Sequence, residues 1–108
     1  MITTLDKIRL FERYLELIQG HIDPAVDVVL SKLLERKRGE LIQRRDEMFT
    51  RLEAFEKQYN MVSSEFFDKF ERGELGDALD FLEWSATWQM YTSVLKSLGA
   101  LSPKPLSI

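Results

Sequence analysis

The chain contains no cysteine and only one histidine, His21, among its 108 residues. The lack of cysteine excludes disulfide bonds, thiolate catalysis and cysteine-based zinc sites together. No second metal ligand or nucleophile stands at a recognisable motif spacing from His21, so His21 is interpreted as a turn or surface residue. A P-loop, a nucleophile elbow and a glycine-rich phosphate cradle are missing as well. We therefore expect no catalytic residue, no metal, no cofactor and no enzymatic activity.

Long apolar runs are also missing. None approaches the ~18–20 residues that a membrane-spanning helix needs, and the N-terminal stretch MITTLDKIRLF lacks the apolar core of a signal peptide. The chain has 15 Lys and Arg against 18 Asp and Glu, which gives a net charge of −3. Proteins that bind nucleic acid usually carry a net positive charge instead. We expect no membrane partner, little affinity for nucleic acid and a cytoplasmic location.

The residues that are present follow helical spacing. Thr3 or Thr4 can cap a first helix, with Asp6 in its first turn, and this helix is predicted to end near Gly20. Its apolar residues recur every three to four positions, at Ile8, Phe11, Leu15 and Ile18.

A second, long helix follows after a short break. Asp23 can cap it, Pro24 suits its first position, and it is predicted to run to Gln58 or Tyr59. So few linking residues make the first two helices antiparallel neighbours. A heptad column of apolar residues recurs along it, at Leu34, Leu41, Met48, Phe55 and Val62. The distal half of this helix needs a cover, which is either the C-terminal region folding back or a second subunit.

Two shorter helices complete the prediction. Ser63 can cap a third helix that ends at the glycines of RGELGD, and Asp77 can cap a fourth that runs to about Leu98 and is closed by Gly99. The face of the fourth helix is aromatic-rich: Phe81, Trp84, Trp88, Tyr91, Leu95 and Leu98. The sequence thus predicts an all-α fold. It comprises an antiparallel helical hairpin with a long second helix, a short third helix and an aromatic-rich fourth helix, in one domain over residues 1–98 with a flexible tail over 99–108.

Three groups of side chains are candidates for a site. The first is a ladder of carboxylates spaced by three residues: Glu74, Asp77, Asp80 and Glu83. Such spacing drifts by about 60° per step around a helix, so the four fan out instead of converging on a cation. Helix capping and dipole stabilisation are the favoured interpretation, with metal binding, acid–base chemistry and partner contact as alternatives.

The second candidate is a basic stripe on the long helix. Its members are Lys37, Arg38, Arg44, Arg45 and Arg51. A stripe of this kind could follow a phosphate backbone. However, between Lys32 and Asn60 positive residues outnumber negative ones by only eight to six. A solvated face with i, i+4 ion pairs is therefore favoured over ion pairs with a partner protein or another subunit, and over nucleic-acid binding.

The third candidate is the aromatic pair Trp84 and Trp88, one helical turn apart. Packing in the core is the favoured interpretation. The alternative is an anchor for a partner, because Trp is enriched in binding hot spots.

The segment YNMVSSEFFDKFERGELGDALDFLEWSATWQMY resembles a group of small bacterial and archaeal proteins. These carry Y-x-M-x-S-x-E-x-F, then F-x-x-G-E-L-G-D-x-x-D-F-x-E-W, then an aromatic pair. The matching residues are Tyr59, Met61, Ser63, Glu65, Phe70, Gly73, Glu74, Leu75, Gly76, Asp77, Asp80, Phe81, Glu83, Trp84 and Tyr91. The chain departs from the group at Trp88.

The resemblance implies an antitoxin-like partner that neutralises a small ribonuclease toxin. It would make the acidic ladder, with Trp84 and Trp88, a contact surface for a basic nuclease, and we expect a homo-oligomer, with a dimer favoured. A self-assembling coiled-coil scaffold and a weak nucleic-acid binder that uses the basic stripe are the alternatives.

Overall fold

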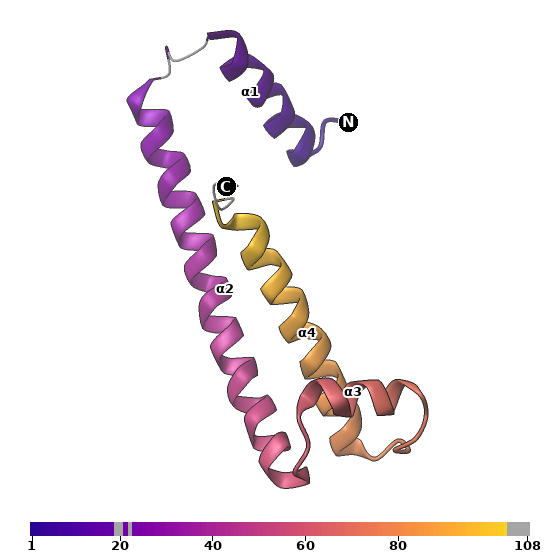
Figure 1. The fold of residues 1–108 in the computed structure, drawn as a ribbon. Coiled ribbons are helices and arrows are strands. Elements are labelled where there is room, and N and C mark those ends of the chain that lie inside the picture. The colour runs from indigo at the N-terminus through magenta and orange to yellow at the C-terminus, as the bar shows by residue number, and fades with distance from the viewer. Residues whose placement is uncertain (19–20, 22, 104–108) are drawn as a thin grey trace, which may run out of the picture. The chain divides into compact units, whose positions relative to one another are not determined.

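The computed structural model describes residues 1–18, 21 and 23–103. Within them every regular element is a helix: α1 (Thr4–Ile18), α2 (Pro24–Tyr59), α3 (Ser63–Glu71) and α4 (Leu79–Leu101) (Figure 1). The predicted all-α fold is confirmed, with a long second, a short third and an aromatic-rich fourth helix. The predicted end of the first helix at Gly20 and the predicted flexibility of residues 104–108 lie outside the described residues.

The chain forms two compact units, Met1–Glu35 and Arg36–Ile108. The boundary falls inside α2, which continues through it as helix, and through Gly39 as well. Each unit is described by itself. The prediction of one domain over residues 1–98 stays a prediction.

The N-terminal unit is a helical hairpin made of α1 and the start of α2. At the start of α1, the Thr3 backbone N–H donates to the Asp6 carboxylate, and the Asp6 N–H donates to the Thr3 hydroxyl, both at 3.1 Å. This reciprocal cap confirms Thr3 as the capping residue. Asp23 caps α2 through a 2.9 Å bond from the Ala25 N–H, also as predicted. Good caps begin both helices, yet α1 has no buried residue.

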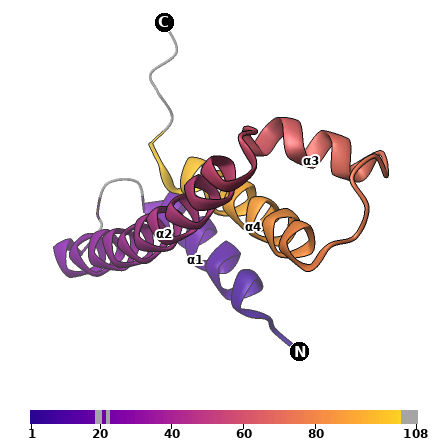
Figure 2. The ribbon, with the colours of Figure 1, turned by 90° about the horizontal axis from the view of Figure 1, so that it is seen from below.

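The C-terminal unit is built from the rest of α2 together with α3 and α4. The chain turns back after α3, so that α4 lies along α2, and α3 lies beside the start of α4 (Figures 1 and 2). One core cluster joins α2 to α4 through Leu41, Met48 and Val94. The C-terminal region of the same chain therefore folds back and covers the distal half of α2, which was one of the two covers expected from the sequence.

Both turns that lead into and out of α3 depend on left-handed residues. Asn60, at φ 52°, follows α2, and the Met61 N–H bonds back to the Glu56 carbonyl. Gly73, at φ 76°, follows α3, and the Glu74 N–H bonds to the Lys69 carbonyl. These are the long hydrogen bonds of Schellman-type helix ends. They stop each helix at a defined residue.

Three predicted helix boundaries are wrong by one or more residues. Ser63 is the first residue of α3 and not its N-cap, which is Val62. Asp77 does not cap α4, whose N-cap is Ala78 without a side-chain bond. Gly99 does not close α4, which continues to Leu101, because a helical glycine costs only ~1 kcal/mol and packing outweighs it. Residues 99–101 are thus helix and not tail.

Candidate functional site

The most organised part of the molecule is an aromatic cluster where α2, α3 and α4 meet. Trp84 is fully buried and stacks on Phe66 of α3, with ring centroids 3.8 Å apart and planes at 4°. Phe55 and Tyr59 of α2 also stack on Trp84, at 5.5 and 5.7 Å. Offset-stacked rings contribute beyond their buried area. One indole therefore joins all three helices.

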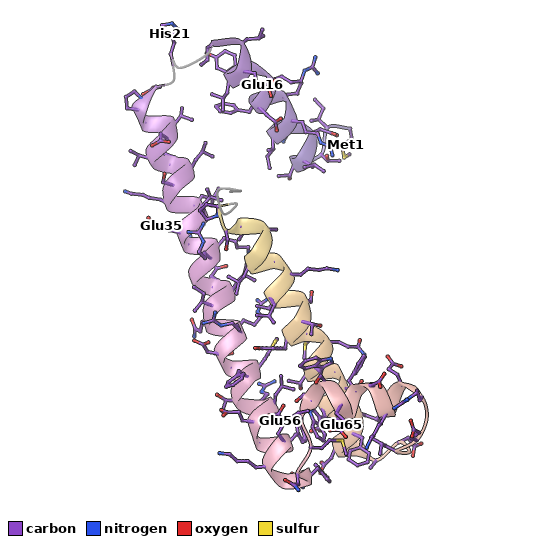
Figure 3. The ribbon with its side chains drawn as sticks, in the orientation of Figure 1. Met1, Glu16, His21, Glu35, Glu56 and Glu65 are labelled. Carbon is purple, nitrogen blue, oxygen red and sulfur yellow. The ribbon has the colours of Figure 1, made fainter. Side chains whose placement is uncertain are left out.

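A chain of hydrogen bonds runs through this cluster. The Trp84 Nε1–H donates to the Ser63 hydroxyl at 2.9 Å, and this hydroxyl donates to the Glu56 carboxylate at 2.7 Å. The Ser63 backbone N–H reaches the same carboxylate oxygen at 2.8 Å. The side chain that caps α3 is therefore Glu56 of α2. The sequence had predicted Ser63 as the capping residue. Figure 3 labels Glu56 near the end of α2.

Sequence reasoning missed Glu56. The residue precedes Ser63 by seven positions across a helix end, and a capping box joins residues only three apart. The one available signal was the indole N–H of a core tryptophan, which needs an acceptor when buried.

A second polar contact lies at the edge of the cluster. The Tyr59 hydroxyl donates a hydrogen bond to the Asp80 carboxylate, and Gln58 donates to the same oxygen at 3.4 Å. The bond to Asp80, with burial and the negative charge of Asp80 as lesser causes, raises the pKa of Tyr59. Asp80 thus joins the first turn of α4 to the end of α2.

The other members of the acidic ladder separate from one another. Glu74 forms an ion pair with Arg72 at 2.8 Å, and Asp77 is exposed in the turn before α4. Glu83 is exposed on α4, and its carbonyl accepts from the Thr87 hydroxyl at 2.8 Å. Across residues 1–18, 21 and 23–103, no three His, Cys, Asp or Glu side chains are grouped so as to hold a metal ion. The four carboxylates are thus not grouped at one site. Only Asp80 and Glu83 lie on a helix, so the predicted drift around a helix applies to that pair alone.

The basic stripe is divided among different contacts. Arg38 is half-buried and donates at 2.6 Å to the carbonyl of Leu101, the last residue of α4. Lys37 pairs with Glu40 at 3.4 Å, and Arg45 with Asp46 at 3.0 Å. The stripe is therefore mainly a solvated face with local ion pairs, plus one arginine that caps α4.

The two tryptophans differ in exposure. Trp84 has no accessible surface, so it is a core residue and not a partner contact. Trp88 is half-buried beside the same cluster, and its ring centroid lies 6.0 Å from that of Tyr91. Of the pair, only Trp88 keeps surface that a partner could contact.

A shallow hollow of about 460 Å³ lies between α2 and α4. Its walls bring together Arg51 of the basic stripe and Glu83 of the acidic ladder, with Phe55, Thr87 and Met90. One arginine and one carboxylate in an open hollow can bind by charge, but they form no nucleophile–base pair.

No protein-family model matches this chain, and comparison with curated proteins and with solved structures finds no match. In the described part of the chain, no helix is both long enough and apolar enough to span a membrane.

Proposed function

We propose that this chain is a non-enzymatic protein-interaction module of the cytoplasm, antitoxin-like in the sense that it binds and neutralises a small basic nuclease. The supporting observation is the charge of the segment that contains α3, the following turn and the start of α4. From Glu65 to Glu83 it has seven carboxylates against two cations, Lys69 and Arg72. The rest of the chain has no such excess.

The backbone of this acidic segment is fixed by buried residues and by its turn. Phe66, near the start of the segment, and Trp84, just after its end, are fully buried, and Gly73 and Gly76 adopt positive φ in the turn between the helices. A partner that binds here would meet carboxylates whose backbone is already ordered, so little conformational entropy is lost on binding.

A ribonuclease needs a basic groove for RNA, and an acidic helical surface is complementary to it. Within the ladder, Asp77 and Glu83 are the contact residues of this proposal, because both are exposed. Asp80 is bonded to Tyr59 and supports the fold, and Glu74 is paired with Arg72.

The proposal is tested by a pull-down of the tagged full chain from its source cells at moderate salt, with mass spectrometry of the eluate. A stoichiometric small basic protein is expected. The nuclease activity of that protein on RNA is then measured with and without this chain, and the chain is expected to inhibit it.

Two variants make the test specific. The double variant Asp77→Lys/Glu83→Lys should lose both capture and inhibition. Glu47→Lys/Glu53→Lys makes the same charge change at two exposed positions of α2 and should retain both. If the first variant still captures and inhibits the nuclease, the acidic segment is not the contact surface and the proposal fails.

A self-assembling coiled-coil scaffold remains the second candidate, because α1 exposes most of its apolar residues. The nucleic-acid alternative is less well supported: Lys37, Arg38 and Arg45 are engaged with groups of the chain itself.

A further inference from the structure

We draw no further inference here: the strongest candidate, the apolar groove of about 620 Å³ between α1 and the start of α2, is lined by apolar side chains of the N-terminal hairpin, and nothing in the structure shows what covers it.

Discussion

The indole nitrogen of Trp84 lies 2.9 Å from the hydroxyl oxygen of Ser63, twenty-one residues earlier in the chain. Because that hydroxyl in turn donates to Glu56, the contact joins α4, α3 and α2 through three side chains. It explains how a polar residue that is only 1% exposed can sit in an aromatic core. A buried polar group is tolerated where its hydrogen bonds are satisfied.

Ser63→Ala tests this chain of bonds. It should lower the free energy of unfolding by about 2 kcal/mol, because it leaves the buried Trp84 N–H without its acceptor and removes one of the two donors from residue 63 to Glu56. Chemical denaturation followed by circular dichroism measures the loss. Ser64→Ala, the same change at the exposed next residue, should stay within about 0.5 kcal/mol of the wild type. Equal effects of the two changes would contradict the role given to Ser63.

The Tyr59–Asp80 bond predicts a dependence of stability on alkaline pH. The raised pKa of Tyr59 means that the folded chain holds this proton more tightly than the unfolded chain does. Its contribution is fully present below the unfolded value of about 10 and is lost as pH rises through the higher folded value.

Tyr59→Phe should therefore flatten the fall of the melting temperature above about pH 10, measured against the wild-type chain in the same buffers. Tyr14→Phe, at an exposed position of α1, should not change the fall of the melting temperature at alkaline pH. If the melting temperature of both variants falls with pH as that of the wild-type chain does, Tyr59 is not the source of this pH dependence.

Glycine substitutions should have opposite signs in the helix and in the turn. At Gly39, inside α2, an added Cβ meets nothing within 4 Å, so Gly39→Ala should stabilise the fold by about 0.5–1 kcal/mol. At Gly73, φ is +76°, so Gly73→Ala should destabilise it by about 1–2 kcal/mol although the space is open. Thermal unfolding of both variants checks this, and a stabilising Gly73→Ala would show that the turn does not need its left-handed residue.

Arg38 should matter more to stability than its neighbours in the basic stripe. Arg38→Ala removes the 2.6 Å bond to the Leu101 carbonyl and should cost about 1–2 kcal/mol, with faster amide exchange in the last turn of α4. Arg44→Ala, at an exposed position, should change the free energy of unfolding by less than about 0.5 kcal/mol. Equal exchange rates in the two variants would argue against a cap by Arg38.

The local features of the fold could be predicted from the sequence because short-range chemistry determines them. The caps at Thr3 and Asp23, the first position of Pro24 and the end of α2 at Tyr59 are each set by residues within one turn. The helical period of the apolar residues likewise determined the number of helices and identified the aromatic face of α4.

Contacts between distant residues could not be predicted in this way. The cap of α3 was assigned to Ser63 and that of α4 to Asp77, because a sequence shows only nearby capping residues. The N-caps are Val62 and Ala78, and Glu56 of α2 accepts the capping bond from the Ser63 N–H. Which tryptophan is enclosed, and whether α2 is covered by its own chain, depended on how α4 folds back.

The sequence by itself thus determined where helices form and which of their faces are apolar, since these follow from propensity, capping and period. Only the tertiary structure decided what each face meets. It buried Trp84 in the core and placed the guanidinium of Arg38 on the last carbonyl of α4. The physical reason is that burial and long-range hydrogen bonds depend on which surfaces come together, and the pattern along one helix does not contain that information.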